Sequence, residues 1–309
     1  MKDEQPIQPS TRYTKPSKQI ARMTICTHTG HRNAKSEAQK ARNGSAVLIG
    51  TVVLATLLGC QSMPLPPISP EAVGESVPGT GWLRGYLDRK SLPNSLTLLP
   101  KPPAEGSGAQ AADLIIYSAT RAQRGTPRWS LAAEDANLEF PQAPTAFECA
   151  MDLPFSQQRT PHLNMLLQRS IGDAVLSTSA AKKTYNRKRP FLITREATCT
   201  PGDEASMAKE GSYPSGHAAT GWAWALLLTE LAPERADALL ARGYDFGQSR
   251  VICGIHWQSD VDAGRLMGAA TYARLQSDAM FRAQLAEARI EIAEARTKGL
   301  HSERACKVD

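Results

Sequence analysis

The stretch KEGSYPSGHAATGWAWALLL, from Lys209 to Leu228, carries one histidine from a run of turn-forming residues into a long apolar segment. The residues after His217 are small, aromatic and aliphatic, with no charge among them, which is typical of a helix buried on all sides. The chain has six histidines. His217, at the entrance of this helix, is either a structural core residue or one member of a site whose other members lie elsewhere in the chain.

The rest of the C-terminal two thirds also favours helices. Two pairs, Thr126-Pro127 and Thr160-Pro161, have the form of a helix N-cap followed by proline at the first helical position. Apolar side chains recur at helical spacing, and no stretch alternates as a strand would. The sequence therefore predicts an all-α, single helical-bundle domain, with helices over 110–124, 126–138, 160–185, 217–231, 232–254, 258–275 and 279–298.

The composition is that of a globular protein with a substantial core, since 41% of the 309 residues are hydrophobic and 21% are charged. The net charge of +6 comes from residues 1–44, which contain nine Lys or Arg and three Asp or Glu. The remainder holds 36 − 9 = 27 basic and 30 − 3 = 27 acidic residues and is neutral. The charge therefore does not predict a surface for a nucleic acid polymer.

An uncharged apolar run, SAVLIGTVVLATLLGC from Ser45 to Cys60, follows the basic arm. It is shorter than the roughly 20 residues of a membrane-spanning helix and fits the apolar region of a secretory signal. Its last four residues, Leu-Leu-Gly-Cys, resemble a bacterial lipobox, in which Cys60 would be lipidated and become the mature N-terminus. We expect a periplasmic protein tethered to the outer membrane as a lipoprotein. Conventional cleavage and an uncleaved anchor are the alternatives.

Composition divides the chain into four parts. The segment 60–108 is rich in Pro, Gly and Ser, and we expect it to form a tether and an irregular lead-in. The expected parts are 1–59, the basic arm and signal peptide; 60–108, the tether; 109–300, the all-α domain; and 301–309, a tail. The arm is long for a signal peptide, so Met23 is an alternative to Met1 as the start.

The expected export also bears on whether the cysteines form disulfides. Beyond the arm and the lipobox, four remain: Cys149, Cys199, Cys253 and Cys306. An even number in an oxidising compartment favours disulfides and allows three pairings, between which the sequence does not choose. A zinc site is disfavoured because no Cys-x-x-Cys or close Cys/His pair occurs among them.

Three polar clusters lie at predicted boundaries between loops and helices. They are KKTYNRKRPF with Lys182 and Arg189-Pro190, Pro-Ser-Gly-His at 214–217, and SRVICGIHWQSD with Arg250, His256 and Asp260. Taken singly, each has an ordinary interpretation as a turn or as surface charges. Together they supply three cations, two imidazoles and a carboxylate, which is a set suited to phosphoryl transfer.

The three cations, Lys182, Arg189 and Arg250, are expected to stay protonated near neutrality and to hold a phosphate dianion. The turn at Ser215 and Gly216 opens a helix. Its hydroxyl, its backbone N–H groups and the positive end of the helix dipole would therefore face the same anion.

The two histidines would have different tasks. His256, with Asp260 to orient it, has the form of a nucleophile whose tautomer is held by a carboxylate. His217 would then protonate the leaving oxygen, and its helix would serve as a rigid support.

These motifs, Lys-x6-Arg-Pro, Pro-Ser-Gly-His and Ser-Arg-x5-His-x3-Asp in this order, resemble the signature of the superfamily that contains type-2 phosphatidic acid phosphatases, vanadium haloperoxidases and bacterial acid phosphatases. The stretches GSYPSGH, RGYDFGQSRVICGIHWQSDVDAGR and TPRWSLAAEDANL are similar to the class A non-specific acid phosphatases over about residues 85–290. Two positions depart from that class: Ala218 where threonine is common and Ile255 where tyrosine is frequent.

The resemblance implies a metal-independent acid phosphatase that uses no cofactor and hydrolyses a broad range of phosphomonoesters, with phosphotransfer to other alcohols as a side activity. It implies a phosphohistidine on His256 supported by Asp260, proton transfer by His217, and phosphate binding by Lys182, Arg189, Ser215, Gly216 and Arg250.

Several alternatives stay open. The same site could hold vanadate in a haloperoxidase, and the fold could persist in an envelope lipoprotein without activity. The physiological substrate is not predicted. The stretch at 286–296, with Leu285, Ile290 and Ile292 as an apolar stripe, is either a solvated helix or a contact in a homo-oligomer.

Overall fold

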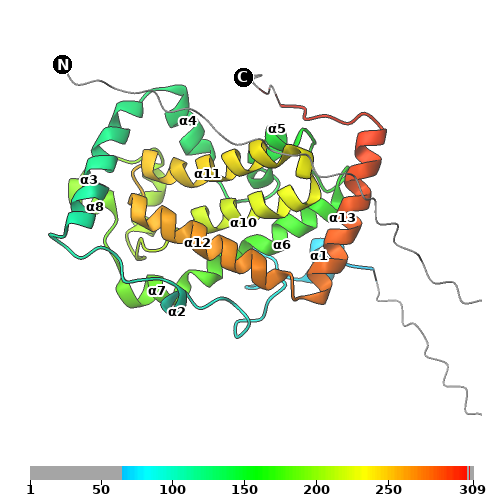
Figure 1. The fold of residues 1–309 in the computed structure, drawn as a ribbon, viewed down its shortest axis with the longest axis horizontal. Helices are drawn as coiled ribbons and strands as arrows, with labels where there is room; N and C mark the ends of the chain where they lie inside the picture. The colour runs from blue at the N-terminus through cyan, green and yellow to red at the C-terminus, as the bar shows by residue number, and fades with distance from the viewer. Residues whose placement is uncertain (1–64, 305, 307–309) are drawn as a thin grey trace, which may run out of the picture. The chain divides into compact units, whose positions relative to one another are not determined.

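The computed structural model describes residues 65–304 and 306, and Figure 1 shows the arrangement of their helices. The helices are α1 (Pro70–Val73), α2 (Ser95–Leu98), α3 (Gly108–Thr120), α4 (Pro127–Glu134), α5 (Glu148–Met151), α6 (Pro161–Ser177), α7 (Ser179–Tyr185), α8 (Pro190–Thr194), α9 (Glu204–Met207), α10 (Gly216–Leu231), α11 (Ala236–Ile252), α12 (Gln258–Leu275) and α13 (Ala279–Thr297). Within these residues, the only β pairing is an isolated bridge between Glu75 and Leu83. The predicted all-α class is confirmed.

Helix α10 is the centre of the bundle and packs against α11, α12 and α6 (Figure 1). It has apolar residues on every side, and Trp224 and Leu228 are fully buried. Two glycines let the neighbouring helices approach closely. A Cβ at Gly264 of α12 would lie 2.4 Å from the carbonyl oxygen of Ser215, and one at Gly243 of α11 would lie 2.3 Å from the Cβ of Ala225. The start of α10 is therefore held directly against α12.

Several helix boundaries follow the sequence signals. Helices α4 and α6 begin at Pro127 and Pro161, as predicted. The Thr126 hydroxyl caps α4, but the Thr160 hydroxyl instead donates to the carbonyls of Pro154 and Ser156. The first turn of α6 is capped by the carboxylate of Glu291, which accepts from the backbone N–H groups of residues 162 and 163.

The helix expected over 160–185 is divided at Thr178 into α6 and α7. The hydroxyls of Ser177 and Thr178 donate to the carbonyls of Ala174 and Val175 at 2.7 Å. Such bonds compete with helical N–H donors, which explains the interruption. Helix α7 carries Lys182, one of the residues predicted for the site.

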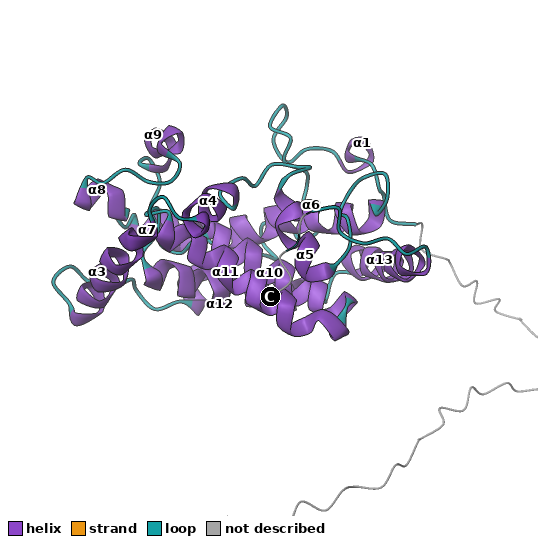
Figure 2. Ribbon diagram, turned by 90° about the horizontal axis from the view of Figure 1, so that it is seen from above, coloured by secondary structure: helices purple, strands orange, loops and turns teal. Residues whose placement is uncertain are grey.

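Helix α13 covers one end of the bundle and packs on α6 (Figure 2). Leu285 and Ile292 are buried, as expected, but Ile290 is 55% exposed. The predicted stripe is wrong at that position, and Ala288 lies in the core in its place. Residues from the lead-in also enter the core, since Leu83, Tyr86 and Leu99 are buried.

Two disulfides connect the four cysteines that the sequence left unpaired: Cys149 with Cys306 and Cys199 with Cys253.

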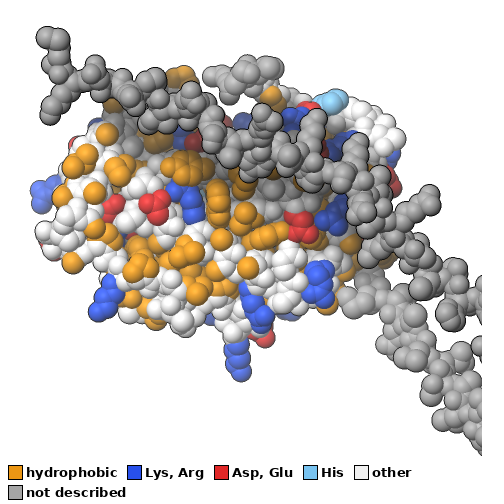
Figure 3. All heavy atoms as spheres, viewed as in Figure 1, with side chains coloured by type: hydrophobic (Ala, Val, Ile, Leu, Met, Phe, Trp, Pro, Cys, Tyr) orange, Lys and Arg blue, Asp and Glu red, His pale blue; other side chains and the backbone are white. Residues whose placement is uncertain are grey.

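On the face drawn in Figure 3, hydrophobic side chains lie scattered among polar ones, and Lys and Arg side chains project along the lower edge. None of the helices in the described range is long and apolar enough to cross a membrane. The basic arm, the predicted signal peptide, Met23 and the lipobox cysteine Cys60 lie outside the described residues.

Candidate active site

A cavity of about 560 Å³ brings together residues from all three sequence motifs. Lys182 of α7, Arg189 before α8, Gly216 and His217 of α10, and His256 before α12 line it. The other three predicted residues, Ser215, Arg250 and Asp260, are buried next to them. The backbone N–H of Ser215 donates to the carbonyl of Asp260 at 2.9 Å, so the second and third motifs are in direct contact.

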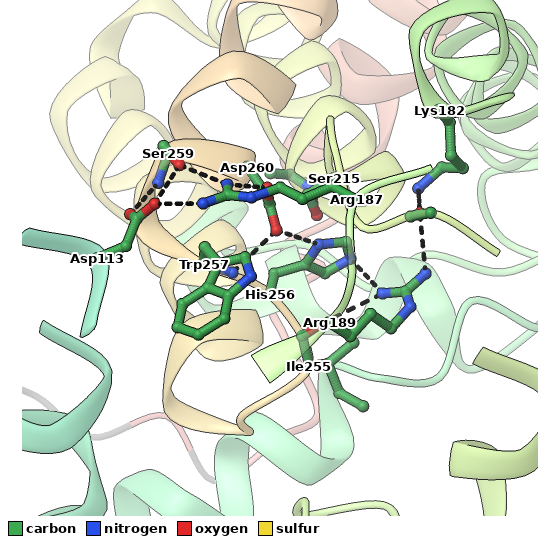
Figure 4. Close-up of polar contacts among 12 residues, drawn as sticks. Asp113, Lys182, Arg187, Arg189, Ser215, Ile255, His256, Trp257, Ser259 and Asp260 are labelled. Atoms are coloured by element: carbon green, nitrogen blue, oxygen red, sulfur yellow. Dashed lines mark hydrogen bonds and ion pairs between the residues drawn. The ribbon is translucent and has the colours of Figure 1, made fainter. Parts of the chain in front are cut away.

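The contacts of His256 determine its tautomer (Figure 4). Its Nε2 lies 3.1 Å from Nη1 of Arg189, and its Nδ1 lies 3.3 Å from the carboxylate of Asp260. A guanidinium can only donate, so Nε2 must accept and the ring proton must reside on Nδ1. Nε2 therefore presents its lone pair on the cation side of the site, as a nucleophile requires.

The carboxylate of Asp260 has partners other than His256. One carboxylate oxygen accepts from the backbone N–H of Trp257 at 2.9 Å, and the other pairs with Arg187 at 2.7 Å. Burial raises the pKa of Asp260, while Arg187 and the Trp257 N–H act to lower it. These two donors therefore favour the ionised carboxylate that orients the imidazole.

Arg187 was not among the residues singled out from the sequence, although it lies between Lys182 and Arg189 in the first motif. Its guanidinium bridges Asp260 and Asp113 of α3, at 2.7 and 2.8 Å, and its side chain is only 8% exposed. Asp113 also accepts from the backbone and hydroxyl of Ser259 in the first turn of α12 (Figure 4). The chain of contacts connects α3 to the orienting carboxylate, so Arg187 is a positioning residue.

We expect Arg187→Met to lower kcat/KM about 10- to 100-fold, because two buried carboxylates lose their common partner. The acid limb of the pH profile should also move to higher pH, since removing Arg187 raises the pKa of Asp260. Arg187→Lys should recover part of the rate. Arg159→Met, which breaks an exposed pair with Glu303, is the matched control. A lower rate with an unmoved acid limb would contradict the positioning role.

Two of the three cations meet at the backbone carbonyl of Gly211, which accepts from Nζ of Lys182 at 3.0 Å and from Nη2 of Arg189 at 3.5 Å. Burial, together with the neighbouring Arg189, lowers the pKa of Lys182 to about 7. The prediction that this lysine stays protonated near neutrality is therefore wrong for the unliganded site. An ammonium loses stability when it leaves water beside another cation.

Arg250, in the last turn of α11, has the features of a side chain that binds an anion. Its side chain is fully buried, yet Nε and Nη1 have no hydrogen-bond partner within the described part of the chain. Burial and Arg189 lower its pKa to about 10. A buried guanidinium without a partner is costly, so an anion bound beside these donors would stabilise it.

The ring proton of His217 is on the opposite nitrogen from that of His256. Its Nε2 lies 2.9 Å from the carbonyl oxygen of Ala136, which can only accept. The proton is therefore on Nε2, and Nδ1 is the nitrogen left to exchange a proton with a ligand. Burial, followed by Arg250, lowers the pKa of His217 well below its ordinary value. Burial and Arg189 do the same for His256.

Ser215 and Gly216 form the turn at the start of α10, as expected. The Ser215 hydroxyl accepts from the backbone N–H of Ala218 at 3.3 Å, so it serves as the N-cap. A Cβ at Gly216 would meet only ordinary contacts, the nearest being Val175 at 3.8 Å. Packing does not demand glycine here, so its position on the cavity wall accounts for the residue better.

The helical bundle and this cation-lined cavity define the class of protein. The chain matches the PAP2 superfamily over residues 164–280. A non-specific acid phosphatase from Providencia stuartii is 45% identical over 209 residues, which cover 67% of this chain and 84% of that protein. A non-specific acid phosphatase from Salmonella typhimurium is 45% identical over 200 residues, covering 64% and 80%. An acid phosphatase from Zymomonas mobilis is 42% identical over 202 residues, covering 65% and 76%.

The chain belongs to the class A bacterial non-specific acid phosphatases of this superfamily, and it is a phosphomonoester hydrolase.

Proposed function

We propose that the protein hydrolyses a broad range of phosphomonoesters through a phosphohistidine on His256, without a metal ion. The observation that carries the proposal is the pair of contacts that leaves the lone pair on Nε2 of His256 beside the cations. Nε2 attacks phosphorus and forms a P–N bond while the bond from phosphorus to the ester oxygen breaks. The leaving oxygen takes a proton from Nδ1 of His217, which makes the alcohol a neutral product.

In the second step, Nδ1 of His217 removes a proton from water, and the resulting hydroxide attacks phosphorus. The P–N bond breaks, and His256 regains its lone pair as inorganic phosphate forms. An alcohol in place of water would accept the phosphoryl group, which gives the proposed phosphotransferase side activity. Lys182, Arg189 and Arg250 stabilise the charge on the equatorial oxygens in both steps, the role that a metal ion has in other phosphatases.

The cations also explain how two histidines with lowered pKa values can have different protonation states. Burial and Arg250 favour a neutral His217 while the site is empty. A bound phosphate dianion offsets the positive charge and raises the pKa of His217, so the imidazole can carry the proton that it donates. His256 keeps a neutral nucleophilic ring through its contact with Arg189.

The direct test is turnover of p-nitrophenyl phosphate and of a panel of alkyl phosphates by residues 61–309 in the presence of EDTA. Activity that requires added magnesium or zinc would overturn metal independence. Enzyme quenched in alkaline detergent should retain a phosphoryl group that is stable to alkali and lost in acid, as expected of a phosphohistidine.

The pH dependence of kcat/KM follows from Lys182. Its pKa in the empty site is lowered to about 7, so the cation is present below that pH and is lost above it. We expect kcat/KM to decline above about pH 7 and kcat to decline only at higher pH, because bound phosphate keeps the ammonium charged. Lys182→Arg should move the alkaline limb of the kcat/KM profile to higher pH, since arginine retains its proton. Pre-steady-state and steady-state rates from pH 4 to 9 measure both limbs. A rate that still rises at pH 9 would exclude this assignment.

We also propose that the enzyme acts in the periplasm, tethered to the outer membrane through lipid on Cys60. The apolar run that ends in Leu-Leu-Gly-Cys supports this placement, and the two disulfides suit an oxidising compartment. Labelling with a fatty acid in cells expressing the full chain tests the proposal, with Cys60→Ser as the variant that should lose label. Label retained in that variant would overturn it.

A further inference from the structure

The cavity has a second wall, opposite in charge to the phosphate-binding residues. Three carboxylates line it, from Glu139 in the loop after α4 and from Asp203 and Glu210 on either side of α9. Trp82, Leu138 and Met207 add apolar surface to the lining of the cavity. Among the residues that line this cavity, the only Lys and Arg are Lys182 and Arg189, which belong to the phosphate site. The region left for the alcohol is therefore acidic and partly apolar.

The acidic surface continues beyond the active-site cavity. A neighbouring cavity of about 770 Å³ shares Trp82, Leu138 and Glu139 with it. Glu71 and Glu75 also line this second space, and no Lys or Arg lines it within the described residues. An alcohol that extends out of the phosphate site therefore passes the carboxylates of the active-site cavity first. It then reaches those of Glu71 and Glu75 in the neighbouring cavity.

Two of these carboxylates, those of Asp203 and Glu210, are close enough to the cations to favour their charged forms. Asp203 favours the protonated form of Arg250, and Glu210 favours those of Lys182 and Arg189. Arg250 is buried next to the cavity residues, and its Nε and Nη1 have no hydrogen-bond partner within the described residues. A bound ester thus places its phosphoryl group on the cations and its alcohol within the field of the acids.

The wall that carries Asp203 and Glu210 is anchored. The disulfide between Cys199 and Cys253 joins its beginning to the end of α11, three residues after Arg250. Nε of Arg189 donates to the carbonyl of Met207 at 2.8 Å, which fixes the end of α9 against the phosphate site. The acids are therefore held at defined positions relative to the phosphoryl group.

We propose that this wall makes the enzyme selective for phosphomonoesters of cationic alcohols, such as amino alcohols, over esters that carry a second anionic group. A substrate ammonium gains from the carboxylates, whereas a substrate carboxylate or second phosphate is repelled. The inference rests on the proposed hydrolysis of phosphomonoesters and names the substrate class that the site prefers.

Three substrates of equal chain length test the proposal: 2-aminoethyl phosphate, 2-hydroxyethyl phosphate and phosphoglycolate. The decisive quantity is the ratio of kcat/KM for the aminoethyl ester to that for phosphoglycolate, compared between variants and parent. Differences in leaving-group chemistry cancel in that comparison, as does any general change in phosphate affinity. Each of Glu139→Gln, Asp203→Asn and Glu210→Gln should lower the ratio about two- to fourfold, and the triple variant should lower it about tenfold or more.

Salt and a remote variant supply the controls. Raising the ionic strength from 20 to 500 mM should lower the ratio in the parent and change it little in the triple variant, because exposed charges are screened. Glu294→Gln, an exposed acid of α13 that lines neither cavity, should leave the ratio unchanged. Glu210→Lys should lower the ratio further than Glu210→Gln, which keeps the test available if the triple variant does not fold.

The outcomes separate this proposal from the one that it depends on. An unchanged ratio in the single and triple variants, with p-nitrophenyl phosphate still hydrolysed, would overturn the selectivity and leave the phosphatase function intact. Failure of the parent to hydrolyse p-nitrophenyl phosphate would overturn the phosphatase function itself. A lowered ratio that does not depend on salt would show that shape, and not charge, sets the preference, and would also overturn the proposal.

Discussion

Changing His256 to alanine is expected to reduce kcat by about four orders of magnitude or more, because the covalent step disappears. The residual rate would come from direct attack of water on an ester still held by Lys182, Arg189 and Arg250. The measurement is single-turnover hydrolysis of p-nitrophenyl phosphate together with trapping of the phosphoenzyme. Label from a radioactive phosphoryl group should appear in the parent and be absent from the variant.

His162→Ala is the matched control for this loss. His162 is a half-buried histidine at the start of α6, where Nδ1 contacts Gln284 of α13 at 2.7 Å, and it does not line the active-site cavity. Its replacement should leave the phosphoenzyme in place and kcat within a few-fold of the parent. If His256→Ala retained a tenth of the activity or still formed the labelled enzyme, the nucleophile would have to be another group.

Changing His217 to alanine should produce a loss that depends on the leaving group. A poor leaving group such as the alkoxide of glycerol 2-phosphate needs a proton as the ester bond breaks, so kcat/KM should fall about 10³-fold. p-Nitrophenolate hardly needs that proton, and its kcat/KM should fall about tenfold or less. The comparison uses kcat/KM because this parameter covers the steps through release of the alcohol and is independent of the later attack by water.

The same variant should show a second effect in time courses. Without His217 to remove a proton from water, hydrolysis of the phosphoenzyme becomes slow, and p-nitrophenol should appear as a burst followed by a low steady rate. Equal losses of kcat/KM for both substrates would contradict the role of His217 as the acid. A variant without a burst would contradict its role in the second step.

Much of the fold could be predicted because its signals are local. The Thr-Pro pairs mark the starts of α4 and α6, and the apolar run after His217 forms the central helix α10. The division between α6 and α7 was missed because side-chain hydroxyls at Ser177 and Thr178 decide it, and helical periodicity does not register such bonds. Ile290 was misplaced because the orientation of α13 depends on how it packs against α6.

The candidate site was predictable to a similar extent. The three motifs contain the eight residues predicted for the site, and the fold brings all eight together in one cavity or buried beside it. They did not identify Arg187 as a partner of Asp260, because its other carboxylate, Asp113, lies 74 residues away in sequence. The lowered pKa of Lys182 was also not predictable, since it depends on burial beside Arg189.

The sequence by itself determined the helical class, the two imidazoles, the three cations and the orienting carboxylate. Each of these follows from residue types at characteristic spacings within short segments of the chain. The tertiary structure decided which nitrogen of each histidine is free, which cysteines pair and which acids border the cavity. The physical reason is that tautomers, pKa values and wall charge depend on neighbours within a few ångströms. Here those neighbours come from α3, the loop after α4, and the segment around α9, which only the folded chain brings to the same place.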